Sequence, residues 1–159
     1  MRTLLLFLPF LAACSLTLEV VYPGHRISDL RTQSTYCAYA NTRLDYRFYL
    51  EGRLDRLEFY WLPEGVHPEN ARPEERATLR GPIYGGLVRG FVEVTPEGVI
   101  QAVSATSPQG AVAPQGIGVE PNLPPRRLWL RGFTGGLAGP FVAGNPVYPD
   151  ASAFCDPAW

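Results

Sequence analysis

The chain has 159 residues, of which 46% are hydrophobic and 18% are charged, and its formal net charge is -1. Glycine and proline, 16 residues each, make up about a fifth of the chain, which exceeds average usage but stays below the share typical of disordered polypeptides. Aromatic residues at 12% supply the rings that a core needs, so we expect one globular domain. All 14 basic residues are arginine, but they are balanced by acids, and we expect no nucleic-acid partner.

The amino terminus is typical of an exported protein. Arg2 precedes an apolar run at 4–11, and small residues follow. This order of a basic, an apolar and a small-residue segment indicates a secretory signal peptide. The run is too short for a transmembrane helix, which needs about 20 apolar residues.

The last four residues of this region carry a more specific signal. Leu11-Ala12-Ala13-Cys14 resembles the lipobox of bacterial lipoproteins. The resemblance implies cleavage before Cys14 and a diacylglycerol thioether on its sulfur, and two or three acyl chains together anchor a protein stably. It also implies a place on the periplasmic face of the envelope, and Ser15 favours the outer membrane. The alternative is an ordinary signal peptide with a chance cysteine.

The chain is therefore divided into a signal peptide at 1–13, an acylated tether at 14–33 and one β domain at 34–159. Period-two alternation of apolar and polar residues predicts half-buried strands in the domain. We expect strands near 35–40, 43–50, 54–62, 87–94, 99–105 and 126–133. The predicted fold is all-β, an antiparallel sandwich or small barrel built from hairpins with long Pro/Gly-rich loops. An open antiparallel sheet with one short helix is the alternative.

Two tight turns are predicted to join the first three strands. A two-residue loop at Gly52-Arg53 would be a type II′ hairpin turn, and its register opposes Tyr46 to Phe59. A loop at Asn41-Thr42 would oppose Cys37 to Tyr46, with Cys37 on the core side. The three strands would then form a meander.

The remaining segments are predicted from turn and loop residues. Thr95-Pro96-Glu97-Gly98 has the residues of a type I turn between two strands. The polar segment 63–80 is expected to be a loop with a helical turn near Glu74-Glu75-Arg76, and 107–125 an extended connector. Another helical turn is expected at 28–31, and the end of the chain is dense in turn residues.

Cys37 and Cys155 are the two cysteines that remain after processing. In an exported protein such a pair indicates a disulfide, here closing a loop of 118 residues. Two buried free thiols are the alternative.

No group of residues points to catalysis, a metal or another cofactor, and we expect none. The two histidines, His25 and His67, are fewer than the three or four ligands that a zinc site needs unless carboxylates complete it. The chain contains no Gly-x-Ser-x-Gly nucleophile motif. An envelope hydrolase would need one of these histidines beside a carboxylate in a cleft.

Tyrosine and arginine are favoured at recognition surfaces, and both concentrate on the first predicted strands. The candidate partner surface consists of Tyr36, Arg47, Tyr49 and Tyr60. A second basic-aromatic cluster, Arg126-Arg127 with Trp129 and Arg131, is better explained as an exposed strand face with Trp packed on Arg.

The leading hypothesis is a membrane-anchored envelope lipoprotein. Its non-catalytic β domain would bind or support another envelope component, a protein or a polymer. A carrier of small apolar ligands is the first rival, and it requires aromatic side chains that line a cavity instead of filling a core. An envelope hydrolase is the second.

Overall fold

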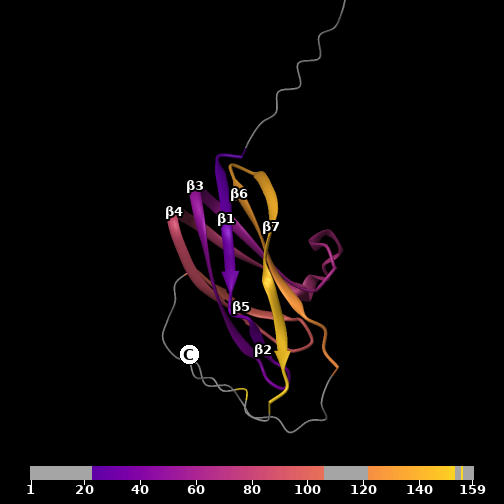
Figure 1. Ribbon diagram of the computed structural model, residues 1–159. Coiled ribbons are helices and arrows are strands. Elements are labelled where there is room, and N and C mark those ends of the chain that lie inside the picture. Colours follow the sequence, from indigo (N-terminus) through magenta and orange to yellow (C-terminus); the bar gives the residue numbers. More distant parts are fainter. Residues whose placement is uncertain (1–22, 106–121, 153–154, 156–159) are drawn as a thin grey trace, which may run out of the picture.

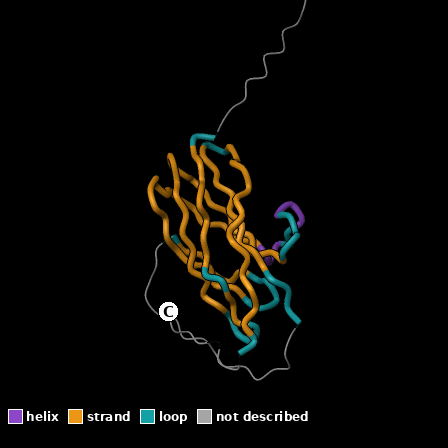
Figure 2. Tube along the Cα trace, viewed as in Figure 1, coloured by secondary structure: helices purple, strands orange, loops and turns teal. Residues whose placement is uncertain are grey.

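The computed structural model describes residues 23–105, 122–152 and 155, and this part of the chain is built from strands (Figure 1). Two short 3-10 turns, Pro68–Asn70 and Pro73–Glu75, lie on a loop beside the sheet (Figure 2). The strands are β1 (His25–Thr32), β2 (Thr35–Cys37), β3 (Thr42–Pro63), β4 (Arg76–Val94), β5 (Ile100–Ser104), β6 (Arg126–Thr134) and β7 (Leu137–Asp150). The predicted all-β fold is confirmed.

The strands form one mixed sheet in the order β2-β7-β6-β3-β4-β5, and β1 pairs with β3 off this path. All pairs are antiparallel except β2 with β7. The ends of this path do not join, so the sheet is not a closed barrel.

Strand β3 turns a corner, and this turn creates two layers. Tyr46 and Phe59 are 13 residues apart on β3, about 43 Å on a straight strand, yet their ring centroids lie 5.3 Å apart. The corner coincides with register shifts between Leu50 and Arg53 and between Leu54 and Arg56. The first half of β3 pairs with β1 and β4, and the second half with β6 and β4. The inner faces of the two halves therefore oppose each other, as in a sandwich whose corner is a bent strand.

The space between the layers is a packed core. Each strand that crosses it contributes apolar side chains at alternate positions, and six of the largest are fully buried: Tyr36, Leu44, Phe48, Phe59, Trp61 and Leu130. Aromatic rings contact one another within it, Tyr46 against Phe59 and Tyr36 edge-on against Trp61 with centroids 5.5 Å apart.

The predicted hairpin at Gly52-Arg53 is wrong. The two halves of β3 do not pair with each other but face each other across the core, so the contact of Tyr46 with Phe59 is not a cross-strand pair. Gly52 has φ 82° and lies against the backbone of Gly24, so a β-carbon there would collide with the Gly24 carbonyl. Glycine therefore serves a corner and a close approach here.

The predicted hairpin at Asn41-Thr42 is also wrong. Strand β2 pairs with the end of β7 in parallel, with Cys37 beside Asp150 instead of Tyr46. Thr42 Oγ1 accepts a hydrogen bond of 2.8 Å from the Cys37 amide. This amide is therefore not free to donate to a backbone carbonyl in a β2–β3 ladder.

The turn at 95–98 is confirmed. The Gly98 amide donates to the Thr95 carbonyl at 3.1 Å, and Thr95 Oγ1 accepts from the Val99 amide at 3.2 Å. The strand predicted at 126–133 is β6, and the 3-10 turn at Pro73–Glu75 covers much of the helical turn expected there.

Three other segments differ from expectation. Strand β1 occupies part of the segment assigned to the tether, and the helical turn expected at 28–31 is wrong because this segment pairs with β3 through a bulge at Asp29, where φ is 51°. The loop expected at 63–80 ends earlier, since 76–80 belongs to β4. The carboxyl-terminal segment, expected to consist of turns, contains the long strand β7.

Candidate functional site

Three arginines lie side by side across the outer face of β1, β3 and β4. Arg47 on β3 is the register partner of Arg31 on β1 and of Arg89 on β4. Residues directly opposite each other on neighbouring strands project from the same face of a sheet, and all three side chains are exposed. We call Arg31, Arg47 and Arg89 the arginine row.

The arginine row has few carboxylate partners. Arg31 pairs with Asp29 at 2.8 Å, and the neighbouring Asp45 pairs with Arg43 at 3.1 Å. Within the described ranges, neither Arg47 nor Arg89 lies within 4 Å of a carboxylate. Like charges opposite each other on adjacent strands destabilise a sheet. This arrangement therefore suits an anion that would lie across the row.

An open groove of about 440 Å³ runs along this row. Two of its lining residues, Tyr46 and Gly90, are register partners on β3 and β4. The full lining consists of Arg31, Thr32, Gln33, Asp45, Tyr46, Arg47, Arg89 and Gly90. Most of its charge is positive, so the groove favours anionic groups.

The next row of the same face is apolar. Tyr49 is the register partner of Leu87 on β4 and of Ser28 on β1. Tyr49 is 53% exposed and Leu87 42% exposed. Large exposed apolar side chains next to arginines are the composition of recognition surfaces.

Of the four residues of the candidate partner surface, two are exposed and two are buried. Arg47 and Tyr49 lie together on the outer face, as predicted. Tyr36 is wrong as a surface residue, since it is 1% exposed, packs against Trp61 and donates to the Pro124 carbonyl at 2.9 Å. Tyr60 is wrong too, since it is 5% exposed and packs against Phe141.

Burial of Tyr60 has a local cause. The loop that carries the 3-10 turns covers the outer face of β3 and β6, where His67 packs on Trp129 and Phe141. Burial and a 2.5 Å hydrogen bond to Glu58 raise the pKa of Tyr60 to about 12. Arg131 stacks over the Phe141 ring at 4.5 Å, so the outer part of the basic-aromatic cluster is a packed strand face, whereas Arg126 is buried.

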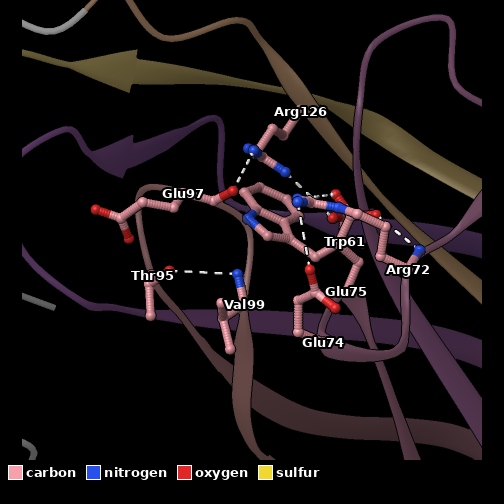
Figure 3. Close-up of polar contacts among 8 residues, drawn as sticks. All are labelled: Trp61, Arg72, Glu74, Glu75, Thr95, Glu97, Val99 and Arg126. Carbon is pink, nitrogen blue, oxygen red and sulfur yellow. Dashed lines mark hydrogen bonds and ion pairs between the residues drawn. The ribbon is translucent and has the colours of Figure 1, made fainter.

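Sequence reasoning missed a buried polar cluster beneath this loop (Figure 3). Arg126 is 5% exposed and donates to the carbonyls of Trp61, at 3.3 Å, and Glu97, at 2.7 Å. Burial lowers the pKa of Arg126, while the charges of Tyr36 and Glu75 raise it by less.

Glu75, also 5% exposed, accepts hydrogen bonds of 2.9 Å from the backbone amide and the guanidinium of Arg72. Burial raises the pKa of Glu75, but these bonds together outweigh it, and the pKa is lowered. The cluster joins the loop to β6 and the β4–β5 turn, so its role is structural. The only sequence signal for it is the pair of acids that follows Pro73, Glu74-Glu75, and this pair does not identify a buried partner.

The two histidines lie in different surroundings. His25 is 8% exposed, and its Nδ1 lies 2.8 Å from Thr134 Oγ1. His67 lies on the exposed loop, 3.7 Å from a Glu69 oxygen. Among the described residues, no three His, Cys, Asp or Glu side chains gather as metal ligands would.

Cys37 and Cys155 form a disulfide with Cα atoms 5.4 Å apart. It fixes residue 155 beside the parallel pair of β2 and β7. Disulfides persist in oxidising compartments such as the periplasm.

Cys14 and the signal segment lie outside the described residues. In the part of the chain that is described, no helix has the length and apolar character needed to cross a bilayer. No family model, curated protein or solved structure matches this chain.

Proposed function

We propose that the chain is a lipid-anchored lipoprotein of the bacterial envelope and that its β domain is a non-catalytic binding module. Two features support the anchor and the compartment. The sequence at 11–14 resembles a lipobox, in which Cys14 would be the acylated residue, and the Cys37–Cys155 disulfide suits an oxidising compartment.

The observation that carries the binding role is the composition of the outer face of β1, β3 and β4. The arginine row holds like charges in register, and the neighbouring row exposes Tyr49 and Leu87. Such a face costs stability, and a bound partner would offset that cost by neutralising the charges and covering the apolar groups.

Packing of the core favours a surface site over a lumen. Tyr46 stacks on Phe48, with ring centroids 6.0 Å apart, and also contacts Phe59. These rings fill the space between the layers, where a carrier of apolar ligands would keep a cavity.

The anchor is tested by labelling cells that express the full chain with radioactive palmitate. The wild-type chain should be labelled and sediment with membranes, and Cys14→Ala should lose both properties. Equal labelling of the variant would refute acylation at Cys14.

Binding by the outer face is tested by hydroxyl-radical footprinting of tyrosines in intact envelopes and in the purified chain. Tyr49 and Tyr148 are matched, at 53% and 54% exposed. Oxidation of Tyr49 should fall several-fold in envelopes, whereas oxidation of Tyr148 on β7 should change little. Equal oxidation of Tyr49 in both samples would contradict the binding role.

A further inference from the structure

Exposed apolar side chains of the sheet gather at one end. The corner of β3 at 50–56, the facing part of β4 at 80–86 and the β6–β7 turn form what we call the corner end. Within the described part of the chain five large hydrophobic side chains are exposed, and four lie at the corner end or one residue from it: Tyr49, Tyr84, Leu87 and Leu137. The fifth, Tyr148, is at the far end of β7.

Contacts within the corner end tie its parts together. Tyr84 is the register partner of Arg53, and the Arg53 carbonyl accepts a 2.6 Å hydrogen bond from the Thr134 hydroxyl. Thr134 in turn is the partner of Leu137 across the β6–β7 turn. Tyr84, at 68% exposed, and Leu137, at 42% exposed, therefore project from the same end of the sheet.

The chain enters the sheet at this end. His25, the first residue of β1, is the register partner of Gly52 at the β3 corner, and β1 runs from there alongside β3 (Figure 1). Cys14 lies ten residues before Gly24. A chain of this length spans at most about 36 Å. An anchor at Cys14 therefore keeps the corner end near the bilayer.

The arginine row is within reach of the same bilayer. Arg31 follows His25 by six residues on β1, which is about 20 Å along a strand. Tyr49 and Leu87 lie between the row and the corner. Along this face, the exposed rings and aliphatic groups therefore lie nearest the corner end, and the guanidinium groups lie farther from it.

We propose that the corner end and the arginine row form a second membrane-contact surface, which lies on the phosphate groups of anionic lipids in the bilayer that holds the anchor. This proposal rests on the proposed function for the anchor itself. Tyrosine is favoured at membrane interfaces because its ring is apolar and its hydroxyl is polar. Arginine pairs with phosphate in bidentate geometry.

The test uses residues 15–159, which contain all described strands and both cysteines of the disulfide but lack Cys14. Binding to vesicles of phosphatidylglycerol and phosphatidylcholine is compared with binding to phosphatidylcholine alone, at 50 and 500 mM NaCl. The chain should bind the anionic vesicles only, and more weakly at high salt. Circular dichroism and melting temperature show that each variant is folded.

Matched variants locate the surface. Arg47→Ala/Arg89→Ala should weaken vesicle binding by roughly 25-fold, about fivefold for each arginine. Arg76→Ala removes one charge from an exposed position at the other end of β4, outside the corner end, and should change binding by well under fivefold. Tyr84→Ser/Leu137→Ser should weaken binding, whereas Tyr148→Ser should not.

The outcomes separate this proposal from the proposed function. Failure to bind anionic vesicles overturns the membrane surface. So does a weakening by Arg76→Ala as large as the weakening per arginine in Arg47→Ala/Arg89→Ala. If Tyr49 is still protected in envelopes, the binding role survives with another partner. Pyrophosphate is titrated as a soluble control, and binding of pyrophosphate without vesicle binding overturns the lipid assignment.

Discussion

Gly98 lies against the guanidinium of Arg126, so that a β-carbon at position 98 would overlap Nη1 and stand 2.6 Å from Cζ. The 2.7 Å hydrogen bond from Arg126 Nη2 to the Glu97 carbonyl fixes the guanidinium in this place. Gly98 also ends the β4–β5 turn with φ 108°. The turn and the buried cation therefore constrain each other.

Gly98→Ala should destabilise the domain more than Gly65→Ala. Both glycines have positive φ, but a β-carbon at Gly65 meets nothing within 4 Å. Gly65→Ala should therefore lower the free energy of unfolding only by the cost of a positive φ at alanine, about 1–2 kcal/mol. Gly98→Ala adds a steric conflict that typically costs about 1–3 kcal/mol. Urea unfolding of the two variants measures the difference, and equal free energies of unfolding would contradict the contact.

Arg126→Met should destabilise the domain by about 2–5 kcal/mol. The substitution leaves the buried carbonyl of Trp61 and the partly buried carbonyl of Glu97 without this donor, and an unmet buried group costs about 1–3 kcal/mol. The neighbour Arg127 supplies the control, since it pairs with Glu64 at a partly exposed site. Arg127→Met should cost about 1 kcal/mol or less. A cost for Arg126→Met as small as for Arg127→Met would mean that the buried cluster is not stabilising.

Reduction of the Cys37–Cys155 disulfide should lower the free energy of unfolding by about 3–5 kcal/mol. The bond closes a loop of 118 residues, and in the chain-entropy model long loops give the larger stabilisation. For a chain of this size the melting temperature should fall by roughly 10 °C. Cys37→Ala/Cys155→Ala should melt at the same temperature with and without reductant. A reductant effect that persists in this double variant would point to another cause.

Stability should decrease as the pH falls below about 6.5, the ordinary pKa of histidine. Burial lowers the pKa of His25 in the folded state, against a smaller opposing effect of the Gly132 backbone. The unfolded chain then binds the proton first, so stability is complete above pH 6.5 and is lost as the pH falls toward the folded-state pKa.

The buried surroundings of His25 fit this preference for the neutral form. Thr134 donates its hydroxyl proton to Arg53, so His25 Nδ1 donates to Thr134 Oγ1. Nε2 is buried without a hydrogen-bond partner. His25→Gln should flatten the decrease of stability between pH 7 and 5, and His67→Gln, which leaves His25 in place, should preserve it. Chemical unfolding at each pH measures this, and unchanged curves for His25→Gln would exclude the assignment.

The sequence predicted strands better than it predicted their partners. Inward residues on β3 are even-numbered up to Leu54 and odd-numbered from Leu57. The switch from even-numbered to odd-numbered inward residues is expected for a hairpin with a two-residue turn. It is equally expected for a continuous strand with two bulges. The alternation alone therefore could not distinguish a hairpin from a bent strand. The deciding contact, Gly52 against Gly24, joins segments that no local pattern relates.

The candidate site shows the same limit. Arg47 and Tyr49 were found because their exposure follows from alternation on β3 itself. Arg31 and Arg89 were missed, since their alignment with Arg47 depends on the register of three strands. Tyr60 has the alternation of an outer residue, but the loop after β3 covers it. Strand β7 was missed because it contains three prolines, which a strand accepts only where the missing amide would point away from a neighbouring strand.

Under the export that we propose, the span of the disulfide has a consequence for the order of events. A chain that emerges amino terminus first exposes Cys37 long before Cys155, with β3, β4, β6 and β7 still to follow. During this interval the only other cysteine outside is Cys14. Conversion of the Cys14 sulfur to a thioether would prevent it from forming a disulfide with Cys37. Acylation at the membrane would therefore leave Cys155 as the single cysteine with which Cys37 can pair.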